Sequence, residues 1–135
     1  MESHAHINLV KIAYNYLTNL VPDENIGLIQ VDTSGNCSGV RVIGNFVPDL
    51  YYECDGLLVI GEAKTEADFD KKHSRAQFNA YIQQCKLHEG RAIFIISVPW
   101  QLLITAKNYF RLKRKQVDIN FEIVVLDEQG RSFKV

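Results

Sequence analysis

The feature that most constrains the fold is the continuous apolar run RAIFIISVP at residues 91–99. Such a run is typical of a central strand buried on both faces, because a strand with one face in water alternates apolar and polar residues. A helical pattern at residues 70–89 precedes it, and before that lies a strand-like run, LLVIGEAK, at residues 57–64. A strand, a crossover helix and a second strand favour parallel pairing within one sheet.

The segments around this unit predict further elements. Apolar residues recur at three- and four-residue spacing over residues 3–20, which predicts an amphipathic helix that ends before Pro22. The other predicted elements are strands at residues 26–32, 40–46 and 49–53, a turn at 34–39, a helix at 100–116 and a strand at 119–127. The order α-β-β-β-β-α-β-α-β indicates an α/β fold with a mixed central sheet flanked by helices.

Length and composition favour one globular domain. The chain has 135 residues, with 47% hydrophobic and 23% charged residues, which suits a single domain at residues 1–135. No stretch approaches the roughly 20 apolar residues of a membrane span, and the N-terminus lacks the pattern of a secretory signal. We therefore expect a cytoplasmic protein without a membrane partner. Cys37, Cys54 and Cys85 are an odd number without CxxC spacing, which indicates free thiols.

Three charged residues stand out in the otherwise apolar stretch PDLYYECDGLLVIGEAK. Its Asp-Gly pair predicts a hairpin, whose pairing would place Asp49 roughly opposite residue 61 or 62. Alternation along the second strand puts Glu62 and Lys64 on the same face. Two converging carboxylates repel each other unless a proton or cation lies between them, and Mg²⁺ prefers oxygen ligands. The stretch predicts a magnesium site, and an exposed ion pair without function is the alternative.

Two motifs in this region resemble those of a known family. Pro48-Asp49, followed after twelve residues by Glu62-Ala63-Lys64, resembles the PD-(D/E)xK signature of restriction-endonuclease-like nucleases. The segment from Gln77 to Tyr81 resembles the QxxxY motif of the RecB-like branch, and its two ends lie on one helical face. The resemblance spans most of the chain and implies a restriction-endonuclease-like fold.

The resemblance implies roles for the residues of the signature. Asp49 and Glu62 would ligate Mg²⁺, for which Mn²⁺ would substitute, and the backbone carbonyl of Ala63 would add a ligand. Lys64 would act on the nucleophilic water. These four residues would form the centre of a phosphodiester-hydrolysing site.

Residues on two helices would complete the implied site. Gln77 would fix the active-site lysine or a phosphate, and Tyr81 would support the same face. Many members of the family add an acid or a histidine from the first helix, and here the candidates are Glu2, His4 and His6. Only His6 is aligned with the apolar stripe of that helix. A capping or surface role stays open for both histidines.

The charges are unevenly distributed, although the net charge is only −1. This value argues against a protein that coats nucleic acid through bulk electrostatics. Acids cluster between residues 53 and 70, and the predicted nucleic-acid contacts are the basic residues beyond them: Lys71, Lys72, Arg75, Arg111, Lys113 and Arg114. An acidic pocket with basic rims fits a metal site that handles phosphates, and a solvated surface is the alternative. Trp100 and Tyr109 are candidates for base stacking or for ordinary packing.

These observations converge on a Mg²⁺-dependent nuclease, expected to be an endonuclease, that cleaves DNA with a metal-activated water. RNA stays open as a substrate. Specificity would come from a homodimer, a partner subunit or the shape of the substrate. Two alternatives remain: a non-catalytic nucleic-acid-binding or assembly module that keeps the nuclease fold, and a hydrolase of another phosphate ester.

Overall fold

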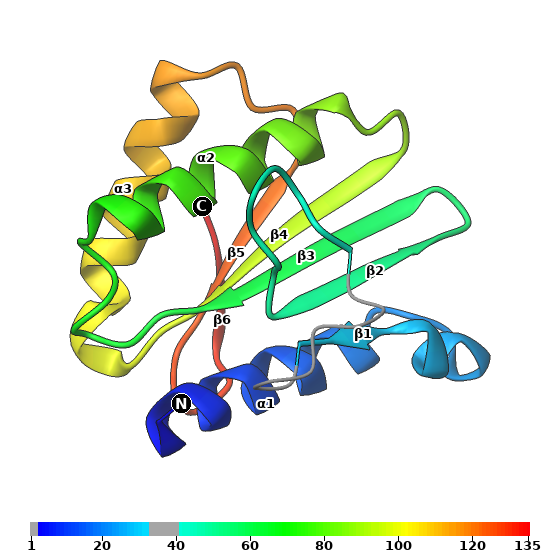
Figure 1. Cartoon of the computed structure of the whole chain (residues 1–135), viewed down its shortest axis with the longest axis horizontal. Coiled ribbons are helices and arrows are strands. Elements are labelled where there is room, and N and C mark those ends of the chain that lie inside the picture. The colour runs from blue at the N-terminus through cyan, green and yellow to red at the C-terminus, as the bar shows by residue number, and fades with distance from the viewer. Residues whose placement is uncertain (1–2, 33–40) are drawn as a thin grey trace.

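The computed structural model in Figure 1 describes residues 3–32 and 41–135, which form three layers. A six-stranded sheet lies in the middle, with α1 (His4–Thr18) on one face and α2 (Lys72–Leu87) and α3 (Leu103–Gln116) on the other. The strands are β1 (Gln30–Val31), β2 (Leu50–Cys54), β3 (Leu57–Ala63), β4 (Arg91–Ser97), β5 (Glu122–Leu126) and β6 (Ser132–Lys134). Glu2, Cys37, Val40 and the predicted turn at 34–39 lie outside the described residues.

The strands lie in the sheet in the order in which they occur in the sequence. β3 pairs with β4 and β4 with β5 in parallel, whereas β1–β2, β2–β3 and β5–β6 are antiparallel. α2 crosses over between β3 and β4, and α3 crosses over between β4 and β5 (Figure 1). The prediction of an α/β fold with a mixed central sheet is therefore confirmed.

The hairpin between β2 and β3 has the predicted turn. Asp55 and Gly56 both have positive φ angles, of 52° and 82°, as a two-residue type I′ turn requires. This turn fixes the register, in which Leu50 pairs with Gly61. One further step along the register places Asp49 opposite Glu62, within the predicted pairing.

The hydrophobic core has two halves, one on each face of the sheet. β4 contributes to both halves: Phe94 and Ile96 pack with α2 and α3, whereas Ile93 and Ile95 pack with α1. All four side chains are buried, because β4 lies in the interior of the sheet with helices on both sides. The prediction of a strand buried on both faces is confirmed.

Two predicted strands are wrong in whole or in part. Residues 26–28 belong to a short 3₁₀ helix, η1 (Asp23–Leu28), and the strand begins only at Gln30. Pro22 and two acidic residues favour a helical start here, and the Asn25 side chain fixes η1 by donating to the Tyr52 hydroxyl at 3.1 Å. Over residues 41–46 there is no strand but one isolated bridge, Ile43–Phe46.

Smaller differences concern the later elements and the termini of helices. The predicted helix at 100–116 begins as a 3₁₀ turn, η2 (Trp100–Leu102), and continues as α3. The last residues form β6, a strand that the sequence pattern did not predict.

Among the described cysteines, Cys54 and Cys85 are free. Within the described ranges, no helix has the length and apolarity needed to cross a membrane.

Candidate functional site

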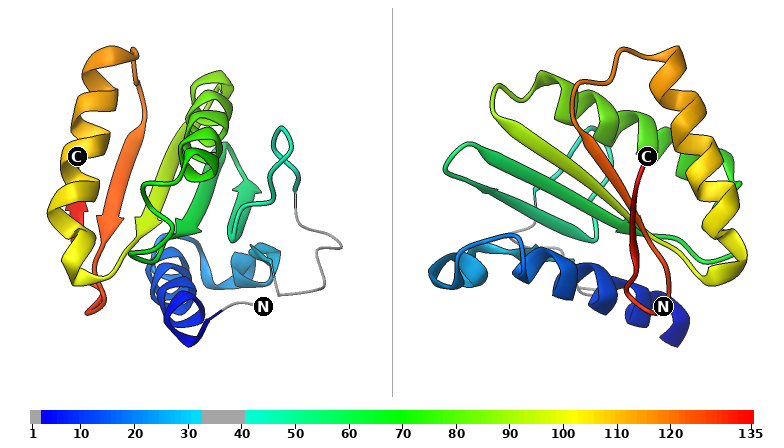
Figure 2. Two further views of the ribbon diagram at one scale, coloured as in Figure 1. Left: turned by 60° about the vertical axis from the view of Figure 1, so that its left-hand side comes forward. Right: turned by 180° about the vertical axis from the view of Figure 1, so that it is seen from behind.

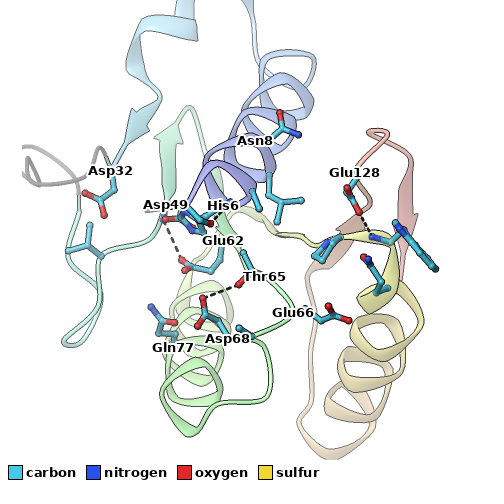
Figure 3. A pocket seen from close by; sticks show the side chains of 18 residues that line it. His6, Asn8, Asp32, Asp49, Glu62, Thr65, Glu66, Asp68, Gln77 and Glu128 are labelled. Atoms are coloured by element: carbon cyan, nitrogen blue, oxygen red, sulfur yellow. Dashed lines mark hydrogen bonds and ion pairs between the residues drawn. The ribbon is translucent and has the colours of Figure 1, made fainter. Parts of the chain in front are cut away.

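A cleft of about 870 Å³ lies at the end of the sheet where the parallel strands finish (Figure 3). Its walls include residues that follow three parallel strands after one intervening residue: residues 65–68 after β3, 99–101 after β4 and Glu128 after β5. Ligands of open α/β sheets bind outside the carboxyl ends of such strands. The cleft therefore lies where this fold is expected to hold its site.

Asp49 and Glu62 lie next to each other in the cleft. The Asp49 amide donates to Glu62 Oε1 at 3.3 Å, and Asp49 Oδ2 accepts the Ala63 amide at 2.8 Å. Both side chains are buried, with residue exposures of 6% and 4%. The hairpin register brings these carboxylates together, and the predicted convergence is observed.

Lys64 lies between Glu62 and Gln77. Its Nζ is 3.6 Å from Glu62 Oε2 and donates to Gln77 Oε1, so the lysine has a partner on β3 and a partner on α2. Lys64 is only 7% exposed. The pair is thus not the exposed ion pair that the sequence left as an alternative, and burying both charges costs free energy that an exposed pair avoids.

The first helix contributes His6 to the site. The Ser3 hydroxyl accepts the His6 amide at 3.1 Å and caps α1, so His6 lies in its first turn. From there His6 Nε2 reaches Asp49 Oδ2 at 3.3 Å. His4 is exposed and does not line the cleft. Of the two histidines, the fold places His6 in the site, as the apolar stripe of the helix indicated.

The electrostatics of the site favour a positive charge. Burial raises the pKa of the Glu62 carboxyl well above its usual range, the charge of Asp49 raises it further, and Lys64 opposes both. Burial also raises the pKa of the Tyr81 hydroxyl, and the charges of Glu62 and Asp49 add to the shift. Burial is the larger cause of both shifts, and the two adjacent carboxylates add to it.

Asp32 is a member of the site that the sequence analysis missed. Its amide donates to the Asp49 carbonyl at 3.0 Å, which extends the β1–β2 pairing by one residue. Asp32, Asp49 and Glu62 therefore form a row of carboxylates across three adjacent strands, and all line the cleft (Figure 3). Asp32 Oδ1 is buried and has no hydrogen-bond partner within the described part of the chain.

The predicted nucleic-acid-binding residues fall into two groups. Three of them are exposed around the start of α2, which is the end of the helix that follows the cleft-lining residues 65–68: Lys71, Lys72 and Arg75. Arg111 and Lys113 lie in the last turns of α3, roughly 12 to 15 Å along the helix axis from its first residue. The two groups approach each other at Tyr109: burial raises the pKa of its hydroxyl and the charge of Arg75 opposes that shift, while Lys113 Nζ lies 5.9 Å from the centre of the same ring.

Arg114 has a structural role in addition to its position on α3. Its guanidinium donates to the carbonyls of Ile119, Phe121 and Val135 at 3.3, 3.1 and 3.0 Å. These contacts tie the end of α3 to the segment before β5 and to the last residue. Such an engaged arginine has fewer donors left for a phosphate than an exposed one.

The two aromatic candidates differ in exposure. Tyr109 is half-buried and stacks edge-on against Phe69 and Phe110, with ring centroids 5.8 and 4.9 Å apart. Trp100 is 67% exposed and lines the cleft. The packing alternative therefore describes Tyr109, and Trp100 is the aromatic residue that a ligand in the cleft would meet.

The side chains present are compatible with Mg²⁺, although they are not a finished metal site. Across residues 3–32 and 41–135, no group of three or more His, Cys, Asp and Glu side chains is arranged to hold a metal ion. Mg²⁺ often takes only one or two carboxylates and completes its shell with water and substrate phosphate. Asp49 and Glu62 supply two adjacent carboxylates, and Lys64 lies beside Glu62.

Comparisons with known proteins add nothing to this geometry: no protein-family model, curated protein or solved structure matches the chain. The chemistry of the cleft is therefore the basis on which a function can be argued. Four of the side chains that line the cleft come from distant parts of the sequence, His6, Asp49, Glu62 and Gln77, and Lys64 contacts two of them, Glu62 and Gln77.

Proposed function

We propose that the chain is a metal-dependent nuclease of the restriction-endonuclease-like fold, which hydrolyses phosphodiester bonds of DNA with a metal-activated water. The observation that carries this proposal is the convergence of Asp49, Glu62 and Lys64 in one buried cluster, with Gln77 and His6 as their direct partners. A purely structural cluster has no need of two adjacent buried carboxylates with a single lysine. Two carboxylates at this range repel each other unless a proton or a cation lies between them, and a bound metal ion would supply that cation.

Asp49, Glu62, His6 and the Ala63 carbonyl are the groups that would hold the metal. A bound Mg²⁺ or Mn²⁺ lowers the pKa of a ligated water and offsets the negative charge that develops on the phosphate. Asp49 is fixed for this task because the Ala63 amide and His6 both contact its Oδ2. Glu62 is held on the neighbouring strand, with one oxygen toward the Asp49 amide and the other toward Lys64.

Lys64 would act on the reacting groups. Its contacts with Gln77 and Glu62 hold the ammonium group beside the carboxylates, where it can orient the attacking water or stabilise developing negative charge. Gln77 is a positioning residue, because its side-chain oxygen holds Lys64 from α2. Tyr81 lies one turn further along the same helix, within reach of the charges of Glu62 and Asp49.

The arrangement of elements around the cluster supports the proposed fold family. The signature residues lie at the end of the β2–β3 hairpin, and Gln77 and Tyr81 lie on the helix that crosses over to β4. This is the order in which the resembled family carries its motifs. The family assignment is part of the proposal and is tested together with the activity.

The test is a panel of nucleic acids incubated with the purified protein and Mg²⁺ or Mn²⁺. The panel comprises supercoiled, linear, single-stranded and branched DNA, together with RNA. We expect cleavage of at least one DNA, with loss in EDTA and a loss of about 10²- to 10⁴-fold in Lys64→Ala. Lys11→Ala, which removes an exposed lysine of α1, is the matched control. Intact substrates throughout, or full activity of Lys64→Ala, would refute the proposal.

A non-catalytic module that keeps this fold is the second candidate. The observation that favours it is that no ready-made group of three metal-ligating side chains exists among the described residues. Calorimetric titration with Mn²⁺ separates the two functions. A nuclease binds Mn²⁺ and loses that binding in Asp49→Ala, whereas a scaffold shows no binding that depends on Asp49.

A further inference from the structure

The outward face of α3 carries a row of exposed side chains that the proposed catalytic cluster does not use. Ile104, Asn108, Arg111 and Lys115 are spaced by four, three and four residues, which places them on one helical face, and all four are exposed. Trp100 precedes them by one turn, in η2. We call these five residues the α3 track.

Trp100 forms the end of the track that meets the cleft. Its indole is 67% exposed. Its backbone is held by the turn after Pro99 and by a hydrogen bond of 2.8 Å from the Trp100 amide to Glu128 Oε1. Glu128 lies across the cleft from Asp32 (Figure 3). The backbone of Trp100 is therefore fixed on the wall opposite Asp32, and its indole is exposed there.

The charges change sign between the cleft and the far end of the track. The described residues that line the cleft include six carboxylates and no lysine or arginine: Asp32, Asp49, Glu62, Glu66, Asp68 and Glu128. Along α3 the exposed face becomes basic at Arg111 and Lys115, roughly 10 to 17 Å beyond Ile104. Figure 1 shows α3 leading away from the cleft end of the sheet. An aromatic surface thus joins an acidic cleft to a basic helix end.

We infer that the α3 track binds an unpaired DNA strand next to the candidate active site, with one base stacked on Trp100 and phosphates near Arg111 and Lys115. The inference rests on the proposed nuclease function and adds the form of the substrate. An aromatic platform together with basic groups is the combination that recognises single strands. The strand must be unpaired, because bases within a duplex are stacked on each other and leave no face for an indole.

The chain offers a direct probe of this contact, because Trp100 is its single tryptophan. Protein in EDTA is titrated with a 20-nucleotide oligo-dT, and with a blunt duplex at the same phosphate concentration, while indole fluorescence is recorded. EDTA prevents cleavage, so binding is measured apart from activity. We expect saturable quenching by the single strand and none by the duplex. Unchanged fluorescence, or equal quenching by the duplex, would overturn the inference.

Variants test the two parts of the track by fluorescence anisotropy of a labelled oligo-dT. Trp100→Ala is expected to weaken binding by about 5- to 150-fold, and Trp100→Phe to retain most of it, since phenylalanine still stacks. Leu87→Ala removes an equally exposed apolar side chain at the end of α2 and is expected to change nothing. Wild-type affinity in Trp100→Ala would show that the indole does not hold a base.

The basic half of the track is tested by salt dependence. Arg111→Gln is expected to lower the slope of log affinity against log salt by about 0.7, the value for one lost phosphate contact on a single strand. Lys11→Gln removes an exposed charge on α1 and is expected to leave the slope unchanged. If Arg111→Gln and Lys11→Gln gave the same slope of log affinity against log salt, the strand would not contact Arg111.

Failure of this inference and failure of the proposed function give different results. Quenching by oligo-dT without cleavage of any nucleic acid would refute the proposed nuclease function and support strand binding by the α3 track. Metal-dependent cleavage without quenching would support the nuclease function and refute strand binding by the track. The exposed indole would then contact another partner.

Discussion

Two buried carboxylates of the same sheet, Asp127 directly after β5 and Glu62 within β3, differ in their hydrogen-bond partners. Asp127 directly follows β5, is 1% exposed, and accepts the amides of Gln129 and Arg131, each at 3.0 Å, and Arg131 Nε at 2.7 Å. Burial alone would raise the pKa of Asp127, but the donors of Arg131 and Gln129 outweigh it and lower the pKa.

Glu62 is as deeply buried as Asp127 but has a poorer set of partners. It accepts one long amide bond from Asp49, faces the Asp49 carboxylate and shares Lys64 with Gln77. Its pKa is raised by burial and by Asp49, opposite in direction to the shift of Asp127. Asp127 is thus a structural carboxylate that holds a turn together. Glu62 has too few donors and positive charges around it for a structural role, which suits metal binding or catalysis.

The largest effect expected from this comparison is on activity in Glu62→Gln. The substitution keeps the shape of the side chain and removes its charge, so cleavage should fall by about 10²- to 10⁴-fold. The free energy of unfolding should stay the same or increase, because burial and the Asp49 charge outweigh Lys64 and disfavour the charged form of Glu62 in the folded state. Cleavage rates and urea unfolding measure the two effects. Glu66→Gln alters an exposed carboxylate of the same cleft and is the control.

Asp127→Asn should show the reverse behaviour. The amide cannot serve both the Arg131 side chain and the two backbone donors as the carboxylate does, so we expect the free energy of unfolding to fall by about 1 to 3 kcal/mol. Cleavage should be retained under conditions where the variant is folded. Urea unfolding measures the loss, with exposed Asp118→Asn as the control. A stable Asp127→Asn would contradict the assignment of a structural role.

The pH dependence sharpens the same contrast. Because the pKa of Asp127 is lowered in the folded state, its contribution to stability is fully present above the unfolded pKa of about 3.9. That contribution is lost as pH falls through the lower, folded value. The stability difference between wild type and Asp127→Asn should therefore be constant between pH 5 and 7 and shrink below about pH 4. A difference that persists unchanged at pH 3 would contradict this reasoning.

The parts of the molecule that the sequence predicted well are those that local rules determine. The Asp55-Gly56 turn sets the register of the β2–β3 hairpin, and that register places Asp49 beside Glu62. Four-residue spacing on α2 places Gln77 and Tyr81 on the face that meets β3. The apolar stripe of α1 correctly favoured His6 over His4. In each case the geometry follows from residues close in sequence.

The parts that the sequence did not predict depend on distant contacts. Apolar residues at 26, 28 and 29 fit a strand as well as a 3₁₀ turn, and the contact between Asn25 and Tyr52 decides between them. Asp32 enters the site through the pairing of β1 with β2, two strands that are distant in the sequence. The alternation of Ile29 and Val31, which pack toward α1, was the available signal. Because side chains alternate along a strand, this signal would have placed Asp32 on the face of the sheet that points away from α1.

The smallest effect is expected for Asp32, which has neither the donors of Asp127 nor the lysine of Glu62. A carboxylate at about 8 Å from a divalent cation in a water-like medium contributes about 1 kcal/mol, which is about fivefold in affinity. Asp32→Asn should therefore weaken Mn²⁺ binding by about fivefold at low salt, and by less at high salt, because ions screen this distance. Calorimetry measures the change, with Asp23→Asn on η1 as the control. Loss of all binding would identify Asp32 as a direct ligand, and wild-type affinity would show that its charge does not reach the cation.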